Sequence, residues 1–392
     1  MRRLRVLQVI THFAVGGATE TVLTVCRQLN PAQFDTAILC GKTALNEQTL
    51  LQEAISSGIP VHEVPSLRRA LAPAWEMRAF QDLVQWFKEN SYDIVHTNGS
   101  KAGILGRLAA AKAGVPVIIH TVFGWGHHAH MNPASLFFYR ALERRAACVS
   151  DCLVTVSEAN RAKGLADKIG TTDQYEVVYN GIEIARYRDI SVDSESLRRT
   201  LNIPAGTPVI GTVSRLAPQK APMDFLEVAS LVHLRCPEIR FVFVGGGPMQ
   251  AEFEQALTAK NLQGVVHFLG YRQDVPALLR CFDVFLLTSL WEGLPMVILQ
   301  AMCAALPTVA TAVDGTPEVV IPDETGFLAA PHDCAAMADH ILTLLKQPEL
   351  RAQMGANARN RIDLMFSDHT MIRRIEEIYL ACAERKGLTG TL

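Results

Sequence analysis

Short apolar runs rich in β-branched residues alternate along the chain with longer segments of helical periodicity. In the first half the apolar runs span residues 4–10, 36–40, 93–96, 115–120 and 152–156, and the helical segments span 20–29, 46–57, 74–89, 101–113 and 135–148. Because strands that alternate with helices of this length form βαβ units, the pattern predicts a parallel sheet. The runs are apolar on both faces, which is typical of a sheet that helices cover on both sides.

The alternation stops at residues 182–207 and then starts again. This segment is polar, carries charges of both signs and contains Pro204, so it is expected to link two domains. Apolar runs follow at 209–214, 241–244, 265–269, 284–288 and 308–311, with helical segments at 222–234, 250–260, 275–281, 295–303 and 335–347. The pattern predicts an α/β protein with two doubly wound parallel-sheet domains, residues 1–181 and 208–367. Ligands of such sheets bind outside the carboxyl ends of the strands.

Composition limits the class of protein. Of the 392 residues, 49% are hydrophobic and 19% are charged, which excludes a mainly disordered chain. The net charge of −2 provides no basic field for nucleic acid. The sequence has no run of 18 apolar residues, so no transmembrane helix is predicted. The apolar run near Met1 is too short for a signal peptide. The nine cysteines have no zinc-ligand spacing, so reduced thiols in a cytoplasmic protein are expected.

Two glycine-rich loops follow predicted strands and open helices, an arrangement that lets the backbone approach an anion. Gly16 and Gly17 follow the first strand, and three glycines ending at Gly247 follow the strand at 241–244. The second loop is not a dinucleotide fingerprint, because Gln250 stands where its third glycine would be, and there is no Walker lysine. NAD binding and ATP hydrolysis are therefore disfavoured, while a phosphate-facing loop and a plain tight turn both stay open.

Two cations stand where the first strand of the second domain ends. Arg215 follows the strand at 209–214, and Lys220 lies five residues later. At that edge of a parallel sheet, a guanidinium fork and an ammonium group can clamp a diphosphate. The alternative is that both are ordinary surface cations.

The segment from Glu292 to Gln300 carries the strongest candidate chemistry. The Glu292 carboxylate could accept hydrogen bonds from sugar hydroxyls, and the amides of Gly293 and Leu294 could face phosphate or sugar oxygens. Pro295 stands near the first position of a helix. Gln300 lies on that helix, on roughly the same face as the turn.

Several segments, in order along the chain, resemble glycosyltransferase family 4. They are residues 16–17, 93–96, 178–182, 214–220, 268–272, 289–302, 310–318 and 324–328. The resemblance implies the GT-B fold, in which two Rossmann-like domains face each other across a cleft, with the nucleotide-sugar in the C-terminal domain and the acceptor mainly in the N-terminal one. It also implies retention of the anomeric configuration without a bound metal, and a C-terminal helix, here 368–386, that packs back onto the N-terminal domain.

The resemblance also implies a role for each candidate residue. Arg215 and Lys220 are similar to the family's diphosphate clamp, and Glu292 is similar to the first glutamate of its paired motif, which contacts the donor sugar. These three are the expected catalytic residues. The other expected donor-site residues are the phosphate-facing Gly293, Leu294 and Pro295, the ribose-facing Gln300, Tyr271 and Arg272 where backbone groups meet the base, Glu318 near the donor, and the glycines Gly16, Gly17 and Gly247.

Two positions depart from the family pattern. Gln300 replaces the second glutamate of the pair, so a charge-assisted bond to ribose is lost, a change of about 1 kcal/mol. Phe123 stands where the family often has a histidine. His127 follows closely and could supply an imidazole for the acceptor or for catalysis; the alternative is an ordinary loop histidine. A metal site from His127, His128 and His130 is disfavoured, because no second ligand cluster is visible.

The resulting prediction is a retaining glycosyltransferase. It would move a sugar from a nucleotide-diphosphate sugar, with a UDP-sugar favoured, to a glycan or lipid-linked acceptor in polysaccharide or glycoconjugate synthesis. Arg215, Lys220 and the turn amides would stabilise the departing diphosphate, and no cofactor or metal is expected. Two alternatives stay open: a GT-B sugar-nucleotide epimerase, and a catalytically decayed nucleotide-sugar-binding protein, which Phe123 and Gln300 would favour.

One helical segment suggests a contact with a membrane that carries the acceptor. Three arginines lie beside four apolar residues: Arg140, Arg144 and Arg145 beside Leu136, Phe137, Phe138 and Leu142. This mixture suits an anionic membrane surface. The alternative is a core-facing helix with a solvated edge. The expected location is the cytoplasm, with a peripheral contact at the inner face of the membrane.

Overall fold

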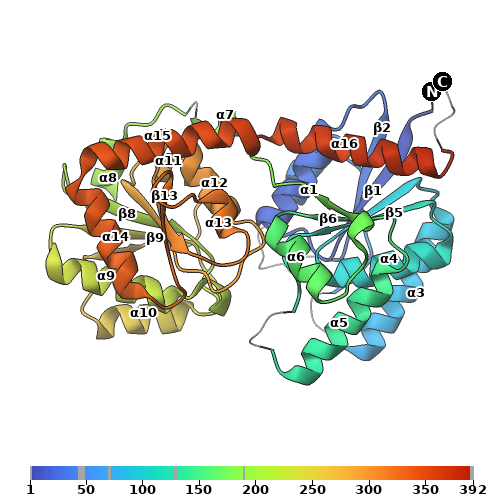
Figure 1. Cartoon of the computed structure of the whole chain (residues 1–392), viewed down its shortest axis with the longest axis horizontal. Coiled ribbons are helices and arrows are strands. Elements are labelled where there is room, and N and C mark those ends of the chain that lie inside the picture. The colour runs from blue at the N-terminus through green and yellow to red at the C-terminus, as the bar shows by residue number, and fades with distance from the viewer. Residues whose placement is uncertain (1, 43–48, 69–71, 128–130, 189, 389–392) are drawn as a thin grey trace. The chain divides into compact units, whose positions relative to one another are not determined.

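The computed structural model describes residues 2–42, 49–68, 72–127, 131–188 and 190–388. The chain divides into two compact units (Figure 1). Unit 1 comprises Met1–Gly181 together with Asp368–Leu392, and unit 2 comprises Ile182–Ser367. Unit 1 is thus built from two separated stretches of sequence, whereas unit 2 is continuous.

Unit 1 contains a seven-stranded parallel sheet in the order β3-β2-β1-β4-β5-β6-β7. Its strands are β1 Leu4–Ile10, β2 Phe34–Cys40, β3 Val61–Glu63, β4 Ile94–Asn98, β5 Val117–Val122, β6 Cys152–Thr155 and β7 Tyr175–Val177. Its helices are α1 Gly17–Gln28, α2 Leu51–Ser56, α3 Pro73–Glu89, α4 Ser100–Ala113, α5 Pro133–Ala147, α6 Glu158–Ala166 and α16 Asp368–Arg385. The strand order reverses between β1 and β4, and doubly wound sheets bind ligands beside such a reversal.

Successive residues of β1 point to opposite faces of this sheet, and both faces are covered. Val6 belongs to a buried cluster with Met371 of α16, whereas Leu7 belongs to another with Leu83 of α3 and Ala109 of α4. This two-sided burial explains why β1 is apolar at nearly every position. The C-terminal helix α16 therefore contributes core residues to unit 1.

Unit 2 contains a six-stranded parallel sheet in the order β10-β9-β8-β11-β12-β13. Its strands are β8 Val209–Val213, β9 Arg240–Val244, β10 Val266–Phe268, β11 Val284–Leu287, β12 Thr308–Thr311 and β13 Gly326–Ala329. Its helices are α7 Ile184–Arg188, α8 Ser194–Thr200, α9 Pro222–Arg235, α10 Gln250–Ala259, α11 Val275–Leu279, α12 Met296–Cys303, α13 Thr316–Val319, α14 Cys334–Lys346 and α15 Pro348–Met365. The two parallel-sheet, Rossmann-like units confirm the predicted fold class.

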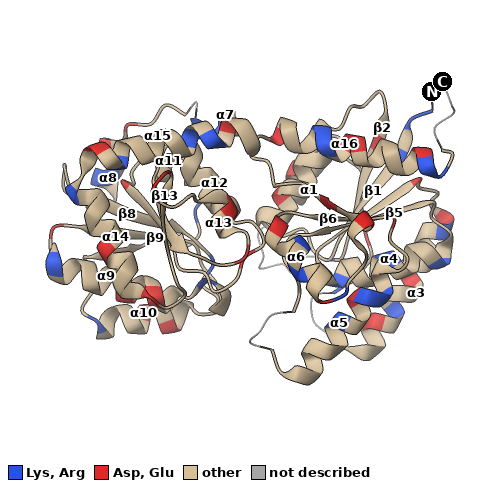
Figure 2. Cartoon of the chain, in the orientation of Figure 1, with Lys and Arg blue, Asp and Glu red and all other residues tan. Residues whose placement is uncertain are grey.

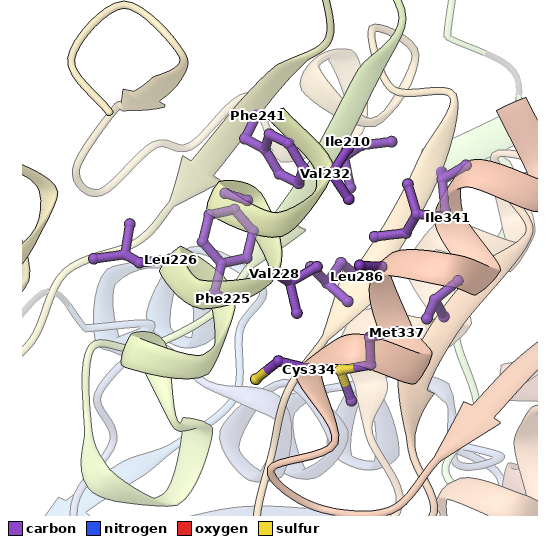
Figure 3. Packing of buried hydrophobic residues seen from close by; sticks show 14 of the residues in the cluster. Ile210, Phe225, Leu226, Val228, Val232, Phe241, Leu286, Cys334, Met337 and Ile341 are labelled. Atoms are coloured by element: carbon purple, nitrogen blue, oxygen red, sulfur yellow. The ribbon is translucent and has the colours of Figure 1, made fainter. Parts of the chain in front are cut away.

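The core of unit 2 packs α9 and α14 against the sheet. Phe225 of α9 packs edge-on against Phe241 of β9, and Val228 of α9 with Met337 and Ile341 of α14 belong to the same buried cluster (Figure 3). This packing fixes the strands whose carboxyl ends carry the candidate donor-site residues.

Among the described residues, no helix has the length and hydropathy that crossing a membrane requires.

The segment expected to be a linker belongs instead to unit 2. The segment contains α7 and α8, and Arg198 of α8 donates to the carbonyl oxygen of Cys281 at 2.7 Å and to the Asp283 carboxylate at 3.1 Å. Asp283 also accepts from the amide of Val209 at the start of β8, at 2.9 Å. The polar composition suggested an interdomain connection, but these polar side chains bind the segment to the sheet of unit 2.

Candidate functional site

The candidate donor-site residues of unit 2 lie beyond the carboxyl ends of neighbouring strands. Arg215 and Lys220 follow β8, Gly247 follows β9, Tyr271 follows β10 and Glu292 follows β11. Glu318 lies beyond β12 in the same way. Because these strands are adjacent in the sheet, their loops meet at one edge, where open parallel sheets bind ligands.

An ion pair joins two of these loops. Lys220 Nζ donates to Oε1 of Glu292, and the hydroxyl of Ser289 donates to the same oxygen at 2.6 Å. The exposed fractions of the Lys220 and Glu292 side chains are 17% and 7%. Within the described residues, Oε2 of Glu292 makes no hydrogen bond. The pair is thus largely desolvated, and one carboxylate oxygen is left for a ligand.

Further hydrogen bonds hold the loops after β8 and β11 together. The amide of Leu290 donates to the carbonyl oxygen of Gln219 at 2.7 Å, and the Gln219 side chain donates to the carbonyl oxygen of Trp291 at 2.8 Å. Thr288 Oγ1 donates to the carbonyl oxygen of Lys220 at 2.9 Å. These contacts fix the backbone on both sides of the ion pair.

Asp314, in the loop after β12, supports Glu292 from another strand. The amide of Glu292 donates to Asp314 Oδ2 at 2.7 Å. Asp314 has a φ of 43°, in the left-handed region that side chains seldom adopt, so the loop holds it in a constrained conformation. The sequence assigned no role to Asp314 or Ser289, although both lie in segments that resemble the family.

Gly245 and Gly247 let the loop after β9 lie directly against the loop after β8. A Cβ at Gly245 would stand 2.0 Å from the carbonyl oxygen of Ser214, and a Cβ at Gly247 would stand 2.4 Å from that of Leu216. Their φ angles of 130° and 157° also favour glycine. The two glycines therefore set the position of the loop that carries Arg215. A ligand contact of Gly247 stays a prediction.

Gln300 is buried on α12, with an exposed fraction of 7%. Its side-chain amide makes no hydrogen bond within the described part of the chain, and neither of its polar atoms is among the buried atoms that lack a partner, so the amide is open to a ligand. Pro295 is the N-cap of α12 and follows the buried residues Gly293 and Leu294. Gln300 as a whole is largely buried, and the ribose contact stays a prediction.

The remaining candidates of unit 2 are more exposed. Tyr271 is 44% exposed, and Glu318 is half-buried. Arg272 donates to Asp274 through Nε at 2.8 Å and Nη2 at 2.5 Å, and this hydrogen bonding raises the pKa of the Arg272 guanidinium. The charge of Arg272 is therefore already matched by Asp274.

Gly16 and Gly17 belong to unit 1, where they begin α1. Gly16 is the N-cap and has an extended φ of 165°, and the nearest atom to a Cβ built there would be Thr19 Oγ1 at 3.9 Å. Neither the backbone conformation nor the packing requires glycine at position 16. A ligand that approaches the backbone closely at this position would explain the glycine.

His127 lies in a buried contact between α5 and α6. Its Nε2 is 2.7 Å from Asp167 Oδ2, its exposed fraction is 1%, and burial lowers the pKa of its imidazole. Arg140 Nη2 is 2.7 Å from the other Asp167 oxygen. This geometry supports the ordinary structural alternative, and a catalytic or acceptor role stays a prediction. His128 and His130 lie outside the described residues, and no potential metal-binding group of His, Cys, Asp or Glu occurs in the ranges that are described.

Comparison with known proteins gives matches in both units. Residues 193–361 match the family model "Glycosyl transferases group 1", and residues 16–181 match "Glycosyl transferase 4-like domain". The UDP-Gal:alpha-D-GlcNAc-diphosphoundecaprenol alpha-1,3-galactosyltransferase of Escherichia coli is 28% identical over 369 residues, which are 93% of this chain and 94% of that protein. A D-inositol 3-phosphate glycosyltransferase of Saccharomonospora viridis is 28% identical, and the match covers 78% of this chain and 76% of that protein.

Solved structures also match over nearly the whole chain. The Anabaena protein Alr3699/HepE, crystallised in complex with UDP, has a TM-score of 0.79 and 25% identity, and the match covers 96% of this chain and 100% of that one. Sucrose-phosphate synthase from Thermosynechococcus elongatus has a TM-score of 0.82 at 20% identity, covering 98% and 100% of the two chains. The second likeness concerns the fold alone.

Proposed function

We propose that this chain, which belongs to the group 1, family 4-like glycosyltransferases, is a retaining enzyme that transfers a sugar from a UDP-sugar to a lipid-linked glycan acceptor. Family matches in both units and relatives named glycosyltransferases confirm the class of enzyme predicted from the sequence. The retaining mechanism, the donor and the acceptor are the proposal. The observation that carries it is the desolvated pair of Lys220 and Glu292 at the carboxyl edge of the unit 2 sheet.

Departure of the nucleotide leaves negative charge on the diphosphate. Arg215 and Lys220, both beyond the end of β8, would stabilise this charge, which is electrostatic catalysis. Lys220 would then share its ammonium group between the Glu292 carboxylate and the diphosphate. Glu292 would accept a hydrogen bond from a hydroxyl of the donor sugar through Oε2.

Retention would follow if the acceptor attacked from the face that the diphosphate leaves. The bond between the anomeric carbon and the diphosphate oxygen breaks, and a bond from that carbon to the acceptor oxygen forms. The proton of the acceptor hydroxyl passes to the departing phosphate, so no protein base is needed. The two cations supply the counter-charge, and we propose that no divalent metal takes part.

The proposed substrates follow from two of the similar proteins. The Escherichia coli relative is named for UDP-galactose and for an acceptor linked to diphosphoundecaprenol, and the Anabaena structure contains UDP. A lipid-linked acceptor would place the enzyme at the inner face of the cytoplasmic membrane. Transfer assays with several UDP-sugars will identify which sugar the enzyme transfers.

The surface of α5 supports a membrane contact. Phe137 and Phe138 are 71% and 59% exposed, and Figure 2 shows the N-terminal part of α5 free of charged residues. Aromatic side chains of this kind enter the boundary between headgroups and acyl chains. Arg140 bonds the Asp167 carboxylate and Arg144 bonds the Asp167 carbonyl oxygen, so these arginines contribute less membrane-facing charge than the sequence suggests.

The test is transfer by the purified full-length chain. UDP-glucose, UDP-galactose and UDP-N-acetylglucosamine are each offered with N-acetylglucosamine diphosphate carried on a short prenyl chain. Mass spectrometry detects the product, and NMR gives its anomeric configuration. We expect UDP release with a retained configuration, unchanged in EDTA. An inverted product would overturn retention, and activity lost in EDTA but restored by manganese would overturn metal independence.

The same assay separates the two alternatives. An epimerase would change the sugar of the UDP-sugar when no acceptor is present. A decayed binding protein would bind a donor, as measured by calorimetry, but would turn over no acceptor in the panel. Either result would contradict the proposed transfer.

A further inference from the structure

A small pocket lies in unit 1 at the carboxyl ends of β4 and β5. Asn98 and Thr121 both line it, and they are register partners across the two strands. Phe123, just after β5, forms part of its wall. The volume open to the centre of a water molecule is about 20 Å³, which suits about one water molecule or one hydroxyl group. The pocket is too small for a sugar ring.

A series of buried hydrogen bonds connects Asn98 to Thr121, and two of its members, Gln8 and His96, also line the pocket. Asn98 Nδ2 donates to Gln8 Oε1 at 2.8 Å, and Gln8 Nε2 donates to the Tyr379 hydroxyl at 2.8 Å. The Tyr379 hydroxyl lies 2.6 Å from His96 Nδ1, and Thr121 Oγ1 lies 2.6 Å from His96 Nε2. All five residues are at most 5% exposed.

The direction of this series is fixed at its first member. Asn98 Nδ2 also donates to the carbonyl oxygen of His96 at 3.1 Å, and because a carbonyl only accepts, the amide nitrogen must face it. Gln8 must then accept through Oε1 and donate through Nε2. The Tyr379 hydroxyl receives that bond, and its own proton is left for His96 Nδ1.

The far end of the series follows from the protonation state of His96. Complete burial lowers the pKa of His96 to about 3, so the ring is neutral at physiological pH. With Nδ1 accepting from Tyr379, the ring proton is on Nε2 and is donated to Thr121 Oγ1. The Thr121 hydroxyl proton and Asn98 Oδ1 are therefore both left for the pocket.

We infer that this pocket binds one hydroxyl group of the acceptor, which donates to Asn98 Oδ1 and accepts from the Thr121 hydroxyl. A hydroxyl both donates and accepts, whereas a carbonyl or an ammonium group would match only one of these two atoms. No charged residue lines the pocket within the described chain, so it does not suit the diphosphate of a donor. Asn180, 3% exposed and also lining it, is placed to make a third contact.

This inference rests on the proposed transfer to a sugar acceptor and assigns roles to residues of unit 1. Thr121 and Asn98 touch the acceptor and determine its specificity. His96 and Tyr379 are positioning residues, because they act by directing the Thr121 proton. The C-terminal helix α16 thus contributes to acceptor binding through the hydroxyl of Tyr379.

The test compares wild type with Thr121→Val, which removes the hydroxyl and keeps the shape of the side chain. The substrates are the prenyl-diphosphate N-acetylglucosamine acceptor and its analogues that each lack one hydroxyl. We expect the acceptor KM of Thr121→Val to rise about tenfold while the donor KM stays unchanged. With one deoxy analogue, wild type and variant should have the same KM, because the bonded hydroxyl is absent from both complexes.

Thr97→Val is the matched control. Thr97 lies on β4 beside Asn98, but its hydroxyl donates to the carbonyl oxygen of Ile119 at 3.2 Å and it does not line the pocket. This variant should keep the wild-type acceptor KM. An equal rise in Thr97→Val would overturn the assignment, because the loss would then reflect the sheet and not the pocket.

A second measurement tests this series of hydrogen bonds without turnover. Nitrogen-15 NMR of wild type should show His96 protonated on Nε2 and not titrating between pH 5 and pH 8, and Tyr379→Phe should alter the Nδ1 signal and raise the acceptor KM. If His96 is protonated on Nδ1 in wild type, the assigned direction of these hydrogen bonds is wrong. Absence of transfer by wild type to every acceptor would defeat the proposed function itself. Active wild type with an unchanged Thr121→Val, or a change only in the donor KM, would overturn the pocket alone.

Discussion

Lys220 and Glu292 are 72 residues apart in the sequence, yet their side chains form an ion pair between the loops that follow two neighbouring strands. Both groups are mostly buried. A buried charge that loses its partner is strongly unfavourable. Each residue therefore stabilises the other as well as any ligand, and experiments at this site must measure stability and turnover separately.

Replacing Lys220 with alanine should cut turnover about a hundredfold or more, the scale of losing a charge-stabilising contact, and should also lower Tm because Glu292 loses its partner. Arg215→Ala should cut turnover by a similar factor with a smaller change in Tm, since Arg215 is exposed. UDP release and calorimetry measure both quantities. Arg235→Ala, which breaks an exposed pair with Asp339, is the control and should change neither. Near-normal rates in both site variants would mean that the diphosphate site is misplaced.

Gln300→Ala should weaken donor binding more than Gln300→Glu does. The alanine leaves ribose hydroxyls without a partner, whereas glutamate gains a charged acceptor and adds repulsion toward the diphosphate, each effect being of order 1 kcal/mol. Gln300→Glu should therefore change donor affinity by less than about tenfold. Calorimetry with UDP-sugar decides the matter, and an alanine variant that binds like wild type would refute the ribose contact.

Gly16→Ala and Gly247→Ala should differ sharply in stability. Position 16 has room for a Cβ and an extended backbone, so Gly16→Ala should keep the wild-type Tm. At position 247 the Cβ would strike the carbonyl oxygen of Leu216, so Gly247→Ala should lower Tm. If a ligand does approach Gly16, that variant should lose donor or acceptor affinity while remaining folded. Unchanged kinetics in Gly16→Ala would remove Gly16 from the binding site.

Unit 1 should lose stability in mild acid. Burial lowers the pKa of His96 to about 3 and that of His120 well below its ordinary value, so both are neutral when folded. The unfolded chain takes up their protons below about pH 6.5, so their contribution is complete above that pH. It falls by about 1.4 kcal/mol per pH unit per histidine as the pH drops toward the folded pKa.

Urea unfolding at pH 7.5 and pH 5 checks this, followed by tryptophan fluorescence, to which unit 1 contributes Trp75, Trp86 and Trp125. His96→Asn should show a shallower dependence on pH than wild type. His332→Asn alters an exposed histidine and should keep the wild-type dependence. Stability that is independent of pH across this interval would contradict the neutral, buried histidines.

Replacing Phe137 and Phe138 with serine should weaken binding to vesicles that contain anionic lipid. The two rings are exposed, so Tm should stay unchanged, while the apolar area available to the lipid boundary falls. Flotation of wild type and the double variant measures the difference. Leu364→Ser, which alters another strongly exposed apolar side chain on α15, is the control. Equal flotation of all three proteins would argue against a contact through α5.

The central strands could be predicted from the sequence, but several edge strands could not. β1 coincides with the apolar run at 4–10 because helices cover both of its faces, and β8 lies within the run at 209–214. The sequence pattern missed β3, β7 and β13, which form outer edges of the two sheets and span only three or four residues each. Short edge strands keep half-exposed residues, so their pattern does not differ from that of a loop.

The candidate site divides in a similar way. Residue types and family motifs indicated Arg215, Lys220 and Glu292, because loops after parallel strands meet at one edge. Pairing across long separations could not be predicted: Tyr379 reaches His96 over 283 residues. Such contacts depend on how α16 packs in the core of unit 1, and no local periodicity encodes that packing.

The interrupted course of unit 1 has a consequence for biosynthesis. When Gly181 leaves the ribosome, the residues of all seven strands have been made, but the helix that packs against β1 and supplies Tyr379 has not. Unit 2 is translated next as one piece and can fold while its neighbour in the sequence still exposes an apolar sheet face. That face therefore stays unburied until residues 368–385 have been made, and exposed apolar surface of this kind makes a nascent chain prone to aggregation.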